Sequence, residues 1–146
     1  MGYELVQLSE LNLKTNTALG IDLNFGENGV FTSLYNEVEH ASAQLKNLLQ
    51  TVPNDRFYHP SYGCDLMRAI FEPSSMELKE YISNLIQQAI LNWLPQLTVT
   101  GLDIKTAEDD PDSPYNIQIT LNTELNGTDL QQLTIFATED GIATIK

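Results

Sequence analysis

The chain carries the stretch Arg56-Phe57-Tyr58-His59-Pro60-Ser61-Tyr62-Gly63-Cys64-Asp65-Leu66 between two segments of helical periodicity. This stretch brings an arginine, a proline, a glycine, a cysteine and several aromatic residues into one connection. A connection needs such residues when it has a fixed shape, because proline restricts the backbone angles and glycine permits angles that other residues rarely adopt. The sequence therefore predicts a shaped loop, followed by a short helical turn over residues 65–71.

The segments on both sides of this loop have the apolar spacing of amphipathic helices. The first helical pattern begins at Phe31, with Thr32 or Ser33 as the capping residue, and Pro53 ends it. In the second pattern, Ser74-x-x-Glu77 is a capping box and Pro95 stops the helix. Its apolar stripe consists of Leu78, Tyr81, Ile82, Leu85, Ile86, Ala89, Ile90 and Trp93.

Beyond Pro95 the apolar residues recur with a period of two, which is typical of strands. The first strand spans residues 97–105, and a slip of phase at Gly101 predicts a β-bulge. Residues 115–125 alternate between apolar and polar, as in a strand with one face in the core. Asn126-Gly127 and Asp140-Gly141 predict tight turns that lead into strands over residues 130–137 and 142–145.

Together these elements predict an α+β fold. Two amphipathic helices pack on one face of a small antiparallel sheet of about four strands. Residues 1–28 are polar and weakly periodic, and we expect them to form an extended N-terminal arm closed by Gly26 and Gly29. Residues 29–146 then form a single domain.

Composition narrows the classes of function. A net charge of −13 argues against direct nucleic-acid binding, which needs clustered basic side chains to displace counterions. No apolar stretch approaches the roughly 18–20 residues needed to span a bilayer, and no signal peptide is evident, so we expect no membrane partner. Cys64 is the single cysteine and cannot form an internal disulfide, which indicates folding in a reducing cytoplasm.

The chain offers few residues for catalysis. His40 and His59 have no partner at metal-ligand spacing, and we interpret His40 as a surface residue and Cys64 as a small buried side chain. Glu72 and Glu77 are the candidates for a glycosidase-like pair, but capping already explains Glu77. The acidic run over residues 108–112 is interpreted as a solvated loop. The sequence predicts a protein that is not an enzyme and needs neither metal nor cofactor.

Several segments, taken together, resemble one known family. They are Leu48-Leu49-Gln50-Thr51, Asp55-Arg56, Pro60-x-Tyr62-Gly63-Cys64-Asp65-Leu66 and Ile70-Phe71-Glu72. In these segments the chain is similar to the baseplate wedge proteins of phage T4-like contractile tails. That family is often labelled lysozyme-like and has counterparts in type VI secretion and other contractile injection systems. The resemblance covers residues 31–137.

The resemblance implies a structural role in which sheath assembly starts by strand exchange. The implied partners are the tail sheath protein, other baseplate wedge proteins and the tail tube. The implied location is the tail baseplate of a virion, or the baseplate of a cellular injection system, assembled in the bacterial cytoplasm. A one-sided meander with an exposed edge can accept a foreign strand through main-chain hydrogen bonds. We assign this sheath-strand pairing to Tyr115, Ile117, Ile119 and Leu121, and the sequence leaves open which strand forms the edge that accepts the arm.

The family usually carries Glu-Pro-Arg at the end of the second helix, a motif linked with docking onto the core bundle of the wedge. The matching residues here are Leu94, Pro95 and Gln96, which keep the proline and lose both charges. A charge-assisted contact therefore cannot be made by these side chains.

The family's signature loop maps onto Arg56, Pro60, Tyr62, Gly63, Cys64, Asp65, Leu66 and Phe71. We expect Arg56 to hold carbonyls or a carboxylate, and Pro60 and Gly63 to fix the turn. The aromatic and apolar residues Phe57, Tyr58, Tyr62, Leu66 and Phe71 are expected to anchor the loop against the helices. Two compatible interpretations remain open, a well-packed connector and a direct contact with a neighbouring wedge protein.

Two alternatives to the baseplate role also remain open. The lysozyme-like label suggests a peptidoglycan hydrolase associated with the tail. A second alternative is an acidic adaptor unrelated to contractile tails, since an acidic surface suits docking onto a basic partner.

Overall fold

The structure is a computed structural model that describes residues 18–25, 31–69, 72, 76–109, 117–130, 132–138 and 141–145. The chain divides into two compact units, Met1–Ala43 and Gln44–Lys146, which are described separately below. The described helices include none that is both long enough and apolar enough to cross a membrane.

The first unit contains a hairpin of two antiparallel strands. Strand β1 (Gly20–Phe25) pairs with β2 (Phe31–Leu34), with Gly20 opposite Leu34 and Phe25 opposite Phe31. The sequence pattern placed a helix from Phe31 onward, and this prediction is wrong at its start. Pairing with β1 keeps residues 31–34 extended, because cross-strand pairing overrides a local apolar period.

Helix α2 (Glu37–Gln50) begins six residues later than the sequence pattern indicated. Its capping residue is Asn36, whose side-chain Oδ1 accepts a hydrogen bond of 3.1 Å from the backbone N–H of Val38. Thr32 and Ser33 lie in β2 instead and cap nothing. His40, on the first half of α2, lies so close to Gly20 that any side chain at residue 20 would collide with its imidazole ring.

The second unit contains the end of α2, a short helix and a long one. Helix α3 (Leu66–Ala69) confirms the predicted helical turn, and α4 (Met76–Trp93) confirms the second amphipathic helix. The capping residue proposed for α4, Ser74, lies outside the described residues. The buried side chains on these helices are Leu45, Leu48, Leu49, Leu66, Ala69, Leu78, Ile82, Ile86, Ala89 and Ile90.

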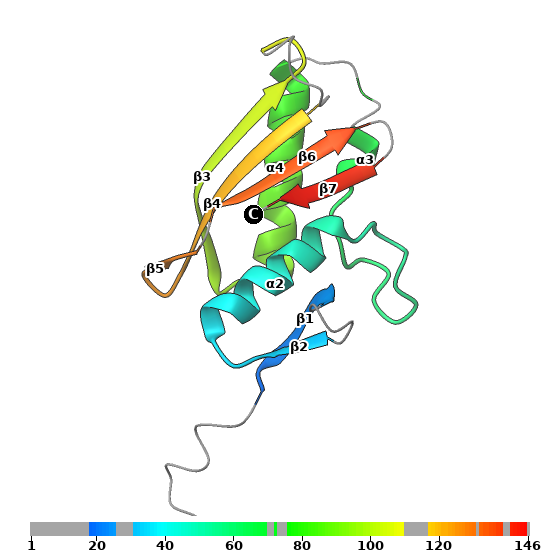
Figure 1. Cartoon of the computed structure of the whole chain (residues 1–146). Helices are drawn as coiled ribbons and strands as arrows, with labels where there is room; N and C mark the ends of the chain where they lie inside the picture. The colour runs from blue at the N-terminus through cyan, green and yellow to red at the C-terminus, as the bar shows by residue number, and fades with distance from the viewer. Residues whose placement is uncertain are drawn as a thin grey trace, which may run out of the picture. The chain divides into compact units, whose positions relative to one another are not determined.

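An antiparallel sheet completes the second unit (Figure 1). Its order is β3 (Leu97–Thr106), β4 (Ile117–Leu125), β6 (Leu133–Thr138) and β7 (Gly141–Ile145). A short strand, β5 (Thr128–Asp129), pairs with the end of β4. The register shift between Val99 and Gly101 confirms the predicted bulge. Positive φ angles of 50° at Asn126 and 84° at Gly127 confirm the tight turn.

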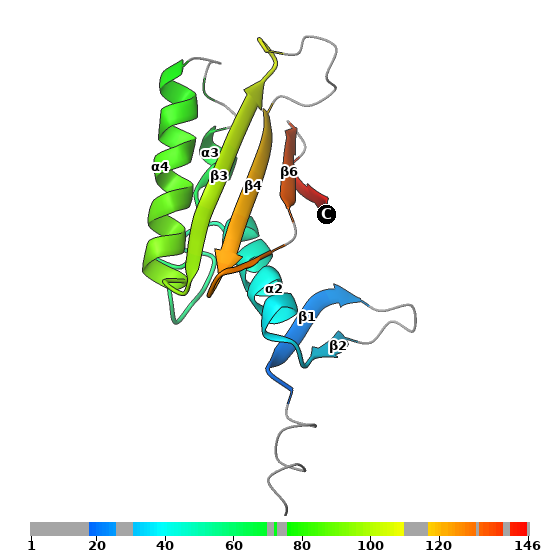
Figure 2. The same ribbon diagram turned by 90° about the vertical axis from the view of Figure 1, so that its left-hand side faces the viewer.

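Helix α4 lies against one face of this sheet (Figures 1 and 2). The sheet contributes alternate buried side chains to the core, namely Ile117, Ile119, Leu121, Thr123 and Leu125 from β4 and Leu133, Ile135 and Ala137 from β6. This alternation is the predicted pattern of a one-sided sheet. The predicted α+β class is thus confirmed, while the expected boundary of an arm at residue 28 stays a prediction.

Candidate functional site

The loop after α2 is closed by backbone hydrogen bonds. The N–H of Asn54 donates to the carbonyl of Pro60 at 2.7 Å, and the N–H of Cys64 donates to the carbonyl of Thr51 at 2.9 Å. These two bonds tie the beginning of the loop to its end. The loop therefore has the fixed shape that its composition predicted.

Gly63 is the residue that this shape requires. Its φ of 126° lies in a region that side chains rarely permit, and an added Cβ would collide with the carbonyl oxygen of Thr51. The same Thr51 carbonyl accepts the hydrogen bond from the N–H of Cys64, so the backbone at the start of the loop lies directly against the backbone at its end. The predicted turn-fixing role of Gly63 is therefore supported by the geometry.

Three side chains of the loop, Arg56, His59 and Tyr62, are linked by ring contacts to one another or to Trp93. The guanidinium carbon of Arg56 lies 3.8 Å from the ring centroid of Tyr62, and the Tyr62 ring meets Trp93 edge to face at 5.1 Å. His59 also lies edge-on to Trp93, with the centroids 6.1 Å apart. Arg56 thus makes a cation–π contact, where the sequence had suggested hydrogen bonds to carbonyls or a carboxylate. These contacts fix the loop onto the last residue of α4.

Burial separates the loop's other residues into two groups. Cys64 and Leu66 are buried, which confirms the prediction of a small buried side chain at Cys64. Burial, together with the smaller effect of the nearby Asp65 carboxylate, raises the pKa of the Cys64 thiol to about 12. Desolvation also raises the pKa of Tyr62, against a smaller lowering by Arg56. The thiol is therefore protonated at neutral pH and is a poor nucleophile.

Phe57 and Tyr58 do not anchor the loop, and this expectation was wrong. Their side chains are 90% and 87% exposed, and their rings contact each other edge to face at 5.4 Å. The short bonds that close the loop on either side of them turn both rings outward. Phe71, the last residue assigned to the loop, lies outside the described residues.

The turn after α4 holds the residues that match the family's docking motif. The backbone N–H of Leu94 still donates to the carbonyl of Ile90 at 2.7 Å, and the Leu94 side chain is buried. Pro95 and Gln96 are exposed. A partner at this turn can therefore reach Pro95 and Gln96, whereas Leu94 belongs to the core.

The residues assigned to sheath-strand pairing need a correction. Ile117, Ile119 and Leu121 lie in β4, which is paired with β3 on one side and with β6 on the other. Their backbone groups therefore have no free edge, and their side chains are buried. Tyr115 lies outside the described residues. Within the described sheet, the strands with a neighbour on one side are β3, β7 and the two-residue β5.

A groove of about 490 Å³ runs along β3, between this strand and α4. The helix lines it with Lys79, Glu80, Ser83 and Asn84, and the strand lines it with Leu102 and Ile104. The sequence does not indicate this groove, because the residues of each wall look like an ordinary polar helix face and an ordinary strand. Their proximity depends on how α4 crosses the sheet.

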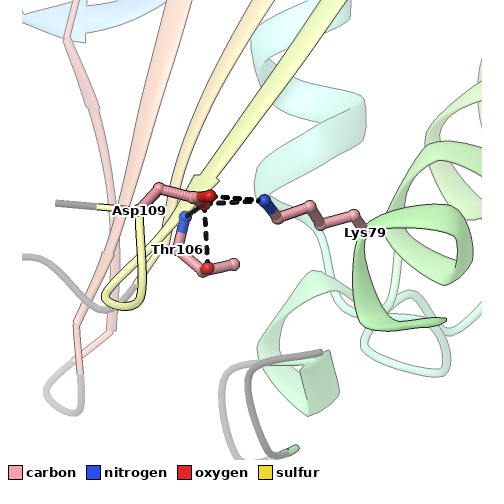
Figure 3. A network of polar contacts seen from close by, with 3 residues as sticks. All are labelled: Lys79, Thr106 and Asp109. Atoms are coloured by element: carbon pink, nitrogen blue, oxygen red, sulfur yellow. Dashed lines mark hydrogen bonds and ion pairs between the residues drawn. The ribbon is translucent and has the colours of Figure 1, made fainter. Parts of the chain in front are cut away.

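Lys79, which lines the groove, forms an ion pair with Asp109 beyond the end of β3 (Figure 3). Lys79 Nζ lies 2.7 Å from Asp109 Oδ2, and the same oxygen accepts hydrogen bonds from the N–H and the hydroxyl of Thr106. The pKa of Asp109 is lowered from 3.8 to about 2. The hydrogen bond from Lys79 is the largest cause of this shift, and the two hydrogen bonds from Thr106 also contribute. Asp109 is exposed, as expected for part of a solvated acidic run, and it also joins the end of β3 to α4.

The candidate catalytic carboxylates lack the surroundings of a glycosidase pair. Glu72 and Glu77 are both exposed, and a general acid needs an apolar pocket to raise its pKa. In the part of the chain that the structure describes, no three His, Cys, Asp or Glu residues are grouped to hold a metal ion.

Comparisons with known proteins place this geometry in a family. The family model described as baseplate wedge protein gp25 matches residues 36–130. Curated proteins gave no match. A chain from the baseplate of the anti-feeding prophage is 27% identical, with a TM-score of 0.57, and the alignment covers 70% of this chain and 78% of that one.

Two further solved structures show the same fold at lower identity. A chain of the post-contracted baseplate of pyocin R2 is 18% identical, with a TM-score of 0.57, and the alignment covers 74% of this chain and 98% of that one. A Geobacter sulfurreducens protein that is called a tail lysozyme is 16% identical, with a TM-score of 0.58. That alignment covers 73% of this chain and 96% of the other.

Proposed function

The chain belongs to the baseplate wedge protein gp25 family, and from this premise we propose that it anchors the first ring of tail sheath by accepting an extended sheath arm at the edge of β3. The family is a structural component of baseplates, and the chain is therefore a structural protein of a contractile tail or injection system. Its partners are other baseplate proteins. The sheath contact is the part that we propose, with β3 taking the role first assigned to β4.

The direction of the backbone groups on β3 supports this proposal. The N–H of Thr106 donates to Asp109, and the carbonyl of Thr106 accepts from the N–H of Asp109 at 2.9 Å, so both groups point away from β4. In an antiparallel strand the N–H and carbonyl of one residue point to the same side, and this side alternates along the chain. Leu102 and Ile104 therefore direct their backbone groups to the outer edge, where a further strand can pair.

The side chains of β3 are the observation that carries the proposal. Leu102 and Ile104 are half-buried and line the groove beside α4, while their cross-strand partners Leu121 and Ile119 are fully buried. A strand added at this edge would place alternate side chains in the groove and cover both residues. Specificity for the arm would come from those side chains, and affinity from the backbone hydrogen bonds.

Two features limit where the arm can pair. The bulge between Val99 and Gly101 interrupts the ladder at one end, and at the other end the outward backbone groups of Thr106 are already bonded to Asp109. Pairing is thereby confined to residues 101–105. Exposed Asp103 and Lys105 on the opposite face oppose unspecific stacking of this edge.

A pair of substitutions at one residue tests the proposal. Ile104→Pro removes the outward N–H, and proline is tolerated on edge strands, whereas Ile104→Ala shortens the side chain and keeps the N–H. Both variants would be expressed in cells that lack the wild-type gene, and particles would be counted by electron microscopy. We expect Ile104→Pro to enter baseplates but to carry no sheath, and Ile104→Ala to keep sheath on a larger fraction of particles.

The outcomes distinguish the choice of β3 as the pairing edge from the sheath-anchoring function itself. Normal sheath on Ile104→Pro particles would contradict pairing at β3. If Thr144→Pro in β7 abolished sheath while Ile104→Pro did not, the sheath role would stand and the arm would pair with β7. Thermal melting of each purified variant shows whether a loss of sheath comes from unfolding.

A further inference from the structure

Phe57 and Tyr58 form the most exposed aromatic pair among the described residues. The two rings are 90% and 87% exposed and contact each other edge to face, so neither is used for packing within the chain. Aromatic residues are enriched in the buried centres of protein interfaces and supply most of their binding energy. An exposed pair of this kind therefore indicates a contact with another molecule.

The loop holds this pair in a defined position. The Asn54–Pro60 hydrogen bond closes the loop around the two residues, and the Tyr62 N–H donates to the His59 carbonyl at 3.0 Å. Arg56, immediately before the pair, is held on the ring of Tyr62. Because the backbone on both sides is already ordered, binding of the two rings would cost little conformational entropy.

The loop lies beside a segment of the chain that carries no charged side chain. The loop stacks on Trp93, and the sequence from Tyr81 to Leu102 contains no acidic, basic or histidine residue, in a chain whose net charge is −13. The charged residues nearest to Phe57 and Tyr58 in the sequence are Asp55 and Arg56, and the Arg56 guanidinium lies on the ring of Tyr62.

We propose that Phe57 and Tyr58 insert into an apolar pocket on a different baseplate protein and fix this chain in the wedge. The contact rests on the baseplate role of the family and is independent of the β3 edge. A second copy of this chain is disfavoured as the occupant, because two chains of net charge −13 repel each other.

Photo-crosslinking in assembled particles tests the contact directly. Tyr58 is replaced by the photoreactive residue p-benzoylphenylalanine, and Met76, which is 74% exposed at the start of α4, receives the same replacement as a control. After irradiation we expect the Tyr58 probe to yield a crosslink to a different baseplate protein, identified by mass spectrometry, and the Met76 probe to yield less of it. A crosslink confined to a second copy of this chain, or equal yields from both probes, would overturn the proposal.

Substitution then separates this contact from the sheath contact. The double variant Phe57→Ala, Tyr58→Ala should melt at the wild-type temperature, because both side chains are exposed, while its incorporation into sheathless baseplates falls at least tenfold. The conservative variant Tyr58→Phe, which keeps both aromatic rings, should be incorporated at the wild-type level. Ile104→Pro should enter the same sheathless baseplates normally, so failure of the β3 edge would leave this result unchanged. Wild-type incorporation of the double alanine variant would refute the proposal.

Discussion

Ile104 and Ile119 face each other across β3 and β4, yet Ile119 is 2% exposed whereas Ile104 is half-buried. Both residues lie on the core face of the sheet. The difference arises because β4 has a strand on each side, while β3 has one neighbour and an open groove. In the isolated chain the hydrophobic face of the sheet is therefore incomplete at β3, and a strand from another protein would complete it.

Gly63→Ala should destabilise the fold by more than about 2 kcal/mol, since a strained positive φ and a collision with the Thr51 carbonyl add together. Gly127→Ala is the matched control, because Gly127 also has a positive φ of 84° but an added Cβ there would meet no atom closer than 3.7 Å. Urea unfolding of both variants measures the difference. Equal losses of unfolding free energy in the two variants would show that the collision with the Thr51 carbonyl contributes nothing to the destabilisation.

Tyr62→Leu should cost about 1–3 kcal/mol, since it removes a cation–π contact with Arg56 and an edge-to-face contact with Trp93. Tyr62→Phe keeps the ring and should cost under about 1 kcal/mol, because the ring and not the hydroxyl makes both contacts. Thermal unfolding, followed by Trp93 fluorescence, gives both values. A Tyr62→Phe variant as unstable as Tyr62→Leu would place the energy in the hydroxyl.

Asp109 should make the stability depend on pH in the acid range. Its pKa falls from 3.8 to about 2 on folding, so the ionised form is stabilised in the native state. This contribution is fully present above about pH 5, well above the unfolded pKa, and is lost as the pH falls through 4 towards 2. The difference in unfolding free energy between wild type and Asp109→Asn, measured from pH 7 to pH 2, should therefore shrink below pH 4.

The exposed neighbour Glu108 supplies the control for that experiment. Glu108→Gln removes the same charge without removing the bonds to Lys79 and Thr106. A pH profile for Asp109→Asn that runs parallel to that of Glu108→Gln would contradict the assigned pKa.

The purified protein should not degrade peptidoglycan. Glu72 and Glu77 are exposed and lack the apolar pocket that a general acid requires. A zymogram with the wild-type chain is expected to show no clearing at a concentration where hen lysozyme clears fully. Clearing that disappears in Glu72→Gln or Glu77→Gln would reverse this conclusion and restore the hydrolase alternative.

Local signals in the sequence predicted most of the second unit. The stripe of α4, the bulge at Gly101 and the Asn126-Gly127 turn each depend on residues close together in the chain, and the structure confirms all three. The start of α2 failed for the opposite reason. Residues 31–34 have a helical period, but their conformation is set by pairing with β1.

The candidate sites were harder to predict, because they depend on contacts between distant segments. Lys79 and Asp109 lie 30 residues apart, and neither local sequence indicates that they pair. The position of β4 inside the sheet depends on the return of β6 to its second edge, which alternation along β4 cannot show. Phe57 and Tyr58 looked like core residues by type, and their exposure follows from the hydrogen bonds that close the loop.

The strand contact at β3 can be tested most directly by cryo-electron microscopy of an assembled baseplate with its first sheath ring, at a resolution that shows backbone density. We expect an extended segment of a sheath subunit paired with residues 101–105, with apolar side chains over Leu102 and Ile104. A sheath-bearing particle in which this edge of β3 faces solvent would contradict it.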